Sequence, residues 1–151
     1  MKAMRIWMSL MGVFYILNLV SLWPSMFAPL LPTMYPGVEL NQGTDSFQLL
    51  LDAWLIVGIQ LAAIGVVLLW AGTLSKHPER YIGVIWVAIV TEIVDGAWDI
   101  YSVAGGLEMP EMGYATVVIH LLWIGSAFWV LGRVKATINS DDSSVDPALQ
   151  I

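Results

Sequence analysis

Three carboxylate side chains recur at helical spacing within an otherwise apolar stretch, YIGVIWVAIVTEIVDGAWDIY, at positions 81–101. They are Glu92, Asp95 and Asp99, at relative positions i, i+3 and i+7, so a helix places them on one face. A charged side chain near the middle of a bilayer costs about 2.5–3.5 kcal/mol on insertion scales. Three on one stripe therefore require a partner, a proton, a metal ion or a water-filled cavity.

His120, in a second apolar stretch, is the expected partner of this acidic stripe. A carboxyl group in apolar surroundings can hold a proton near neutral pH, and an imidazole can exchange one. Glu92, Asp95 and His120 are thus candidate catalytic residues for isomerising or hydrating a hydrophobic substrate. A divalent metal held by the stripe and His120 is an alternative. However, the Glu-x-x-His pattern of helix-bundle metal sites is absent, so we assign no metal ligand, and the identity of any cofactor is left open.

The composition is that of a membrane protein. Of the 151 residues, 58% are hydrophobic and only 12% are charged, and the mean hydropathy is +0.77. The absence of cysteine excludes disulfides, thiol catalysis and cysteine metal sites. The six basic residues lie outside the apolar segments and form no patch for nucleic acid. The expected partner is therefore the lipid bilayer.

The chain contains four apolar segments that are each long enough to cross a membrane as a helix. The first has the basic start of a signal peptide, but its apolar core is longer than usual, so we expect it to be retained. We predict an all-α fold, a four-helix membrane bundle formed by residues 1–138 and followed by a flexible acidic tail, residues 139–151. The predicted spans cover residues 6–26, 49–74, 81–102 and 114–131.

Two features define the long connection after the first span. Prolines in residues 28–44 prevent a long helix, so this loop is expected to fold back over the membrane face. Asp45 and Gln48 have the spacing of a capping box, which would start the second helix near Ser46.

The basic residues all fall on one side of this four-span topology. An even number of spans puts both termini on that side, and the opposite loops carry acidic residues only. The positive-inside rule then predicts cytoplasmic termini in a multi-pass membrane protein. The basic residues are Lys2, Arg5, Lys76, Arg80, Arg133 and Lys135.

Every predicted helix contributes a polar group to one layer in the outer half of the bundle, roughly 6 Å thick at the rise of a helix. Asp52 and Asp99 lie nearer the outer interface. Lipid cannot satisfy such groups, so we expect them to face one another. Interhelical hydrogen bonds for the amides, and interfacial water for the two outer carboxylates, are the alternatives. The layer consists of Asn18, Gln60, Glu92, Asp95 and His120.

The polar row opens toward the outer side and ends before the cytoplasmic half, which favours a blind pocket over a channel. Eight tryptophans and eight methionines fit a lining for a small hydrophobic or aromatic compound, although anchoring and packing also explain them. A homo-oligomer and an accessory subunit of a larger membrane complex are open alternatives. The candidate ligand-binding residues are Asn18, Asp52, Gln60, Trp98, Asp99 and Trp123.

Four stretches covering most of the chain resemble the BphX-like family of small bacterial membrane proteins, found associated with biphenyl-degradation gene clusters. This resemblance implies a four-helix inner-membrane protein, and it transfers no catalytic residue. The stretches are WMSLMGVFYIL, LDAWLIVGIQLAAIGVVLL, EIVDGAWDIY and VVIHLLWIGSAFWVL.

Overall fold

The computed structural model describes residues 1–143, and the regular elements in that range are all helical. Four helices are long and apolar enough to cross a membrane. The prediction of an all-α fold with four spans is thus confirmed at the level of length and composition. The long helices are α1 (Lys2–Ser21), α4 (Asp45–Thr73), α5 (Ile82–Ala104) and α6 (Pro110–Ser143).

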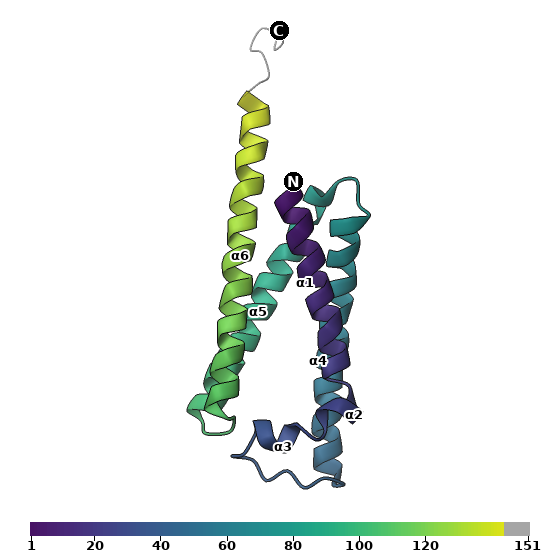
Figure 1. Cartoon of the computed structure of the whole chain (residues 1–151), viewed down its shortest axis with the longest axis vertical. Helices are drawn as coiled ribbons and strands as arrows, with labels where there is room; N and C mark the ends of the chain where they lie inside the picture. The colour runs from purple at the N-terminus through teal and green to yellow at the C-terminus, as the bar shows by residue number, and fades with distance from the viewer. Residues whose placement is uncertain (144–151) are drawn as a thin grey trace.

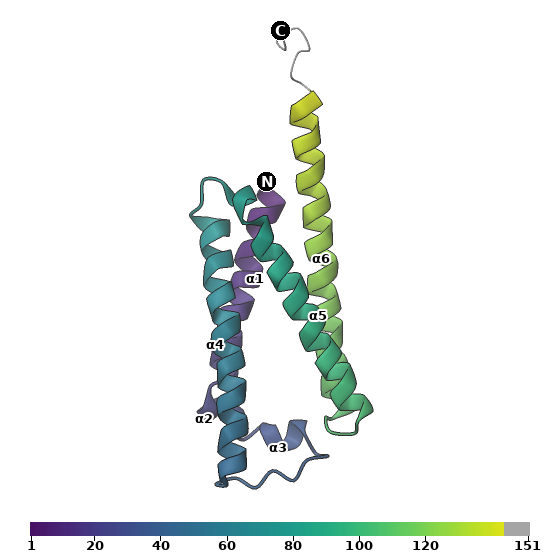
Figure 2. The same ribbon diagram turned by 180° about the vertical axis from the view of Figure 1, so that it is seen from behind.

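The long helices form two antiparallel pairs. Helix α1 packs mainly against α4, and α5 packs mainly against α6. The two pairs lie close at the end that carries the N-terminus and diverge toward the opposite end, where the short helix α3 (Leu31–Met34) lies between them (Figures 1 and 2). A 3-10 turn, η1 (Pro78–Tyr81), leads into α5.

Glycine allows the backbones of α1 and α4 to approach closely. A Cβ atom built on Gly12 would lie 2.7 Å from the carbonyl oxygen of Gly65, and one on Gly65 would lie 2.7 Å from that of Gly12. Gly58 and Gly72, one seven-residue step to either side of Gly65, also face α1. Small residues are a common means of joining helices where no hydrophobic effect drives them together.

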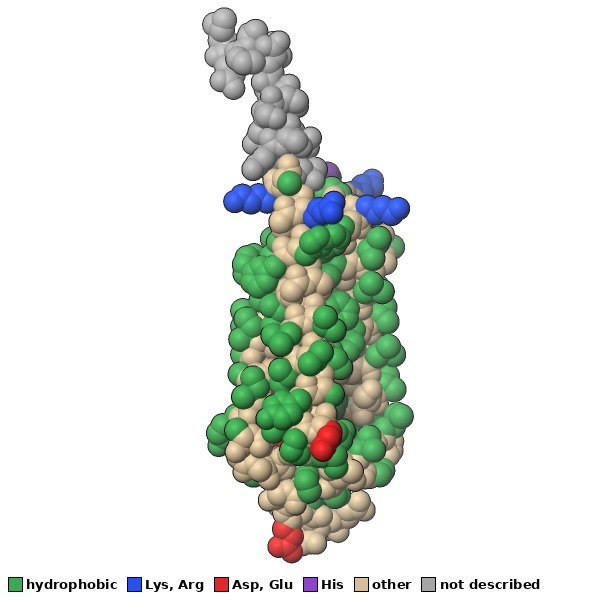
Figure 3. All heavy atoms as spheres, turned by 60° about the vertical axis from the view of Figure 1, so that its left-hand side comes forward, with side chains coloured by type: hydrophobic (Ala, Val, Ile, Leu, Met, Phe, Trp, Pro, Cys, Tyr) green, Lys and Arg blue, Asp and Glu red, His purple; other side chains and the backbone are tan. Residues whose placement is uncertain are grey.

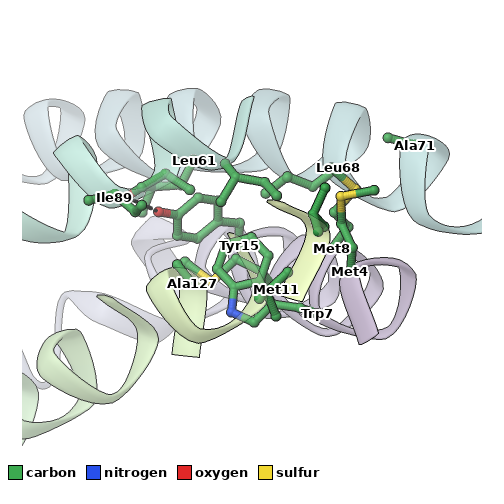
Figure 4. Packing of buried hydrophobic residues seen from close by; sticks show 14 residues of the cluster. Met4, Trp7, Met8, Met11, Tyr15, Leu61, Leu68, Ala71, Ile89 and Ala127 are labelled. Atoms are coloured by element: carbon green, nitrogen blue, oxygen red, sulfur yellow. Dashed lines mark hydrogen bonds between the residues drawn. The ribbon is translucent and has the colours of Figure 1, made fainter. Parts of the chain in front are cut away.

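An apolar core fills the end of the bundle near the N-terminus (Figure 4). Its buried side chains come from all four long helices. The indole of Trp7 donates a hydrogen bond to the Ser126 hydroxyl over 2.8 Å, which joins α1 to α6 within this core. The largest fully buried members are Met4, Met8, Met11, Tyr15, Leu68, Ile85 and Val130.

The loop between α1 and α4 joins the two helix pairs at their open end. Its helices are α2 (Pro24–Phe27) and α3. The amide of Met109 donates to the carbonyl oxygen of Met34 over 2.8 Å, and the amide of Gly37 donates to that of Leu107 over 3.3 Å. The loop is therefore fixed to the turn between α5 and α6.

Helix ends differ from the predictions in three places. Helix α1 stops at Ser21 rather than near Met26, because Trp23 precedes a proline and is held in an extended conformation. The capping-box prediction is wrong, since the hydroxyl of Thr44 accepts the amide hydrogen of Phe47 and caps α4. Helix α6 continues to Ser143, beyond the predicted end of the fourth span at residue 131.

The extension of α6 includes the first residues of the predicted tail. Threonine, asparagine, serine and aspartate predominate in residues 137–143 and rank low in intrinsic helix propensity, so propensity does not explain the extension. Residues 144–151, the remainder of that tail, lie outside the described residues. Helix α5 ends at Ala104, just before Gly105 and Gly106, and α6 begins at Pro110.

The basic side chains lie together at one end of the bundle. Lysine and arginine gather at the end near the N-terminus, and acidic side chains are visible near the other end (Figure 3). The Arg5 guanidinium donates to the carbonyl oxygens of Gly72 and Lys76, both over 3.4 Å, and so satisfies the C-terminal end of α4.

We predict different effects on the free energy of unfolding for two glycine substitutions in these helices. Gly65→Ala should lower the free energy of unfolding by about 1–3 kcal/mol, because the new methyl group overlaps the α1 backbone. Gly125→Ala, whose Cβ meets open space in α6, should be neutral or stabilising by up to about 1 kcal/mol through helix propensity. Denaturant unfolding in detergent micelles measures both, and equal effects would contradict the close α1–α4 contact.

Candidate functional site

A single histidine lies between two carboxylates where α6 crosses α5. The Nδ1 atom of His120 is 2.7 Å from Oε2 of Glu92, and its Nε2 atom is 3.2 Å from Oδ2 of Asp99. Gly96 lies between the two acids on α5, and a Cβ there would be 3.4 Å from that of His120. Because Gly96 has no side chain, the ring can lie against α5, with one carboxylate at each of its nitrogens.

The two contacts of His120 differ in kind. The Nδ1 contact with Glu92 is a hydrogen bond, and Glu92 is only 2% exposed. The Nε2 contact with Asp99 has an ion-pair distance but not hydrogen-bond geometry, so the buried Oδ2 atom of Asp99 has no hydrogen-bond partner within residues 1–143. A buried carboxylate oxygen without such a partner is costly. Asp99 is therefore the less satisfied end of the arrangement.

Tyr15 closes the inner side of this group and was not identified from the sequence. Its hydroxyl donates to the carbonyl oxygen of Ala88 on α5 over 3.4 Å, and its ring is buried in the apolar core (Figure 4). It also interacts with Glu92. Glu92 thus lies between His120 and Tyr15, on the side of the packed core.

Glu108 is a second residue that sequence reasoning missed as part of the site. It is one of the acidic residues of the predicted loops, but it is 3% exposed. The turn at Gly105 and Gly106 folds it back onto α5, where it is hydrogen-bonded to the hydroxyl of Ser102. That hydroxyl also lies 3.0 Å from the carbonyl oxygen of Asp99. A glutamate soon after a Gly-Gly helix stop was the only available signal.

Burial changes the ionisation of Glu108 and Tyr35, which lie in the loops at the open end of the bundle. It raises the pKa of Glu108, and the negative charge of Asp99 adds to this effect, while the hydrogen bond from Ser102 opposes it. Burial also raises the pKa of Tyr35 to about 12, with the charge of Glu108 as the next cause. Ionisation of these two groups is therefore less favourable here than in water.

A cavity of about 630 Å³ separates the two helix pairs at this level. The wall contributed by α4 is entirely apolar and includes Trp54 and Val57. The opposite wall, from α5, α6 and their turn, carries most of the polar groups. The polar residues that line the cavity are Asn18, Tyr35, Asp95, Asp99, Glu108, Thr116 and His120.

The structure brings five of the nine predicted site residues to this cavity. Glu92 does not reach it and lies behind the His120 ring. Trp123 is also away from it and packs against Trp7 and Phe14, with ring centroids 6.1 and 5.2 Å apart. The predicted residues that line the cavity are Asn18, Asp95, Trp98, Asp99 and His120.

Asp52 and Gln60 lie on an exposed face of α4 and outside the cavity lining, so the prediction that they face the other polar groups is wrong. Asp52 accepts a hydrogen bond from Gln48 over 2.9 Å. Asn18 donates to the carbonyl oxygen of Phe14 in its own helix, over 3.0 Å, rather than to another helix. Depth along a helix does not determine how that helix is rotated about its axis, so polar residues at similar depth need not face one another.

The described part of the chain contains no group of three histidine or acidic side chains that could hold a metal ion. The two nitrogens of His120 point toward different carboxylates, and this separates the groups that the metal alternative required to converge. That alternative is not supported by the geometry.

The sequence profile of the BphX-like family matches residues 1–136. The chain belongs to the BphX-like family. It is 50% identical over 125 residues to an uncharacterised BphX-like protein of Burkholderia cepacia and to another of Paraburkholderia xenovorans strain LB400. In each case the match covers 83% of this chain and 88% of the relative. No solved structure matches the chain. The resemblance seen in the sequence is thereby confirmed.

We predict that the buried histidine of this BphX-like chain contributes strongly to stability. His120→Ala should lower the free energy of unfolding by about 3–5 kcal/mol, because it leaves two carboxylates buried without their partner. His77→Ala is the matched control, since His77 makes an exposed pair with Glu79 over 3.1 Å and should produce no measurable change. Chemical denaturation in micelles compares them, and a small loss for His120→Ala would contradict the buried pair.

A second prediction concerns pH. Because the pKa of Glu108 is raised in the folded state, its contribution to stability is complete below its unfolded pKa and is lost as pH rises through the folded value. Glu108→Gln should remove this loss, so the variant gains stability relative to the wild type as pH rises from about 4.5. Glu111→Gln, at an exposed position in the first turn of α6, should show no such trend in thermal unfolding scans.

Proposed function

We propose that this BphX-like protein is a multi-pass membrane protein that binds a small hydrophobic or aromatic compound between its two helix pairs. The observation that carries the proposal is the cavity, whose volume of about 630 Å³ falls within the range typical of small-molecule sites. Apolar helices and a few convergent polar groups are what such a site requires.

The two walls of the cavity differ in a way that would orient a ligand. The apolar body of the compound would lie against Trp54, Val57 and the rest of the α4 wall. Its polar group would face the opposite wall, where Asp99 and His120 lie. A ligand without a polar group would leave that wall unsatisfied, so the proposed compound carries one.

The proposed setting is the bacterial inner membrane, with both termini in the cytoplasm. The gathering of lysine and arginine at the end near the N-terminus supports this orientation. The cavity would then lie in the outer half, and the apolar core would close it toward the cytoplasm. This arrangement supports a blind binding pocket rather than a channel.

Acid–base chemistry on the bound compound is a second candidate function. His120, Asp95 and Asp99 line the same cavity, so each could exchange a proton with a ligand there. Glu92 would position the His120 ring through its hydrogen bond and would not touch the substrate. Isomerisation or hydration of a hydrophobic compound remains the reaction class for this candidate. A role as subunit of a larger complex stays a prediction.

Binding of a neutral aromatic probe tests the first proposal. Tritiated 1-naphthalenemethanol should bind saturably to the protein in phosphatidylcholine nanodiscs, after subtraction of empty nanodiscs. Val57→Trp places a large side chain in the cavity and should weaken binding by about tenfold or more, because the ring occupies the space that the probe needs.

Ile56→Trp is the matched control for that variant. Ile56 is the neighbouring residue on the exposed face of α4, 56% exposed, and its substitution should leave binding unchanged. Equal losses in both variants would reject the cavity as the binding site.

A further inference from the structure

Negative groups outnumber positive ones around the cavity. Three carboxylates, those of Asp95, Asp99 and Glu108, line it, and that of Glu92 lies directly behind His120. His120 is the one cavity-lining residue of positions 1–143 that can carry a positive charge, since no lysine or arginine of that range is in the lining. The basic side chains lie at the far end of the bundle. The wall therefore attracts a cation.

Asp99 supplies a specific point of attachment for such a cation. It is 9% exposed and lines the cavity. Its buried Oδ2 atom has no hydrogen-bond partner in the described part of the chain, although Nε2 of His120 is 3.2 Å away. A donor arriving from the cavity would reach the exposed part of the Asp99 carboxylate, whose side chain is 12% exposed, and would add to hydrogen bonding that the protein itself leaves incomplete.

Aromatic rings lie in the same lining. Trp54, Trp98 and Tyr35 all line the cavity, and the ring of Tyr35 is near that of Trp54, with centroids 6.3 Å apart. Aromatic faces attract organic cations, most strongly where water is excluded. Carboxylates together with aromatic rings distinguish a site for an organic ammonium from a site for an inorganic ion.

We propose that the compound bound in this cavity is a hydrophobic amine, held in its protonated form. The ammonium group donates to the carboxylate of Asp99, with Asp95 and Glu108 adding negative charge, and the apolar body extends toward Trp54 on α4. This inference rests on the proposed binding function and specifies its ligand class. A neutral alcohol could also donate to Asp99, but it would not balance the surplus of negative charge.

Three probes with one ring system separate these possibilities. They are 1-naphthylmethylamine, 1-naphthalenemethanol and 1-naphthoic acid, which present an ammonium, a hydroxyl and a carboxylate on the same apolar body. With protein in phosphatidylcholine nanodiscs and empty nanodiscs subtracted, the amine should bind at least about tenfold more tightly than the alcohol. The acid should bind more weakly than the alcohol, because it meets like charges.

The outcomes of this comparison distinguish the two proposals. Alcohol binding equal to or tighter than amine binding would overturn the amine inference and leave the binding function standing. Failure of all three probes to bind saturably would overturn both. Tighter binding of the amine supports both proposals.

Substitution of single carboxylates then assigns the contact. Asp99→Asn should remove the preference for the amine while keeping the affinity for the alcohol, and the retained alcohol binding shows that the variant is folded. Asp52→Asn, an exposed carboxylate outside the cavity on α4, should keep the full preference. If Asp99→Asn does not fold, Asp95→Asn gives the same comparison with a smaller loss. An unchanged preference in the cavity variant that folds would overturn the inference.

Discussion

The end of the bundle opposite the N-terminus depends on one buried interaction, the contact of His120 with Glu92 and Asp99. Charged groups in an apolar interior are tolerated only when they are paired with good geometry. The two acids lie seven residues apart on α5 with Gly96 between them, so both ring nitrogens can be met from a single helix. The contacts of His120 with these two acids therefore set the position and rotation of α6 against α5 at this level.

The cavity is a consequence of how differently the two ends of the bundle are joined. Near the N-terminus, side chains from all four helices fill the interior, and glycines hold α1 against α4 along its length. At the other end, α5 and α6 follow their own polar contacts and diverge from α4. The loop containing α3 joins the pairs there through backbone hydrogen bonds from Gly37 and Met109. This loop lies between the two helix pairs and also connects them.

Sequence periodicity and charge predicted the helices, their number and the partnership of Glu92 with His120, because these follow from spacing and depth. Rotation about a helix axis did not follow from them. Asp52 and Gln60 share the depth of the site, yet they face outward, since the apolar side chains of α4 fill the inner face. Glu108 was missed because its burial arises from a tight turn that returns it to Ser102, which no local pattern encodes.

The two carboxylates that share the histidine have unequal surroundings, and this inequality bears on what the site can do. Glu92 is hydrogen-bonded to His120, borders Tyr15 and the apolar core, and is shielded from the cavity. Asp99 faces the cavity and keeps one oxygen without a hydrogen bond. A compound that enters can therefore change the partners of Asp99 without breaking the pair that holds α6 in place. Glu92 supports the fold, and Asp99 is the acid that faces the cavity. Binding of a ligand at Asp99 therefore does not require loss of the fold.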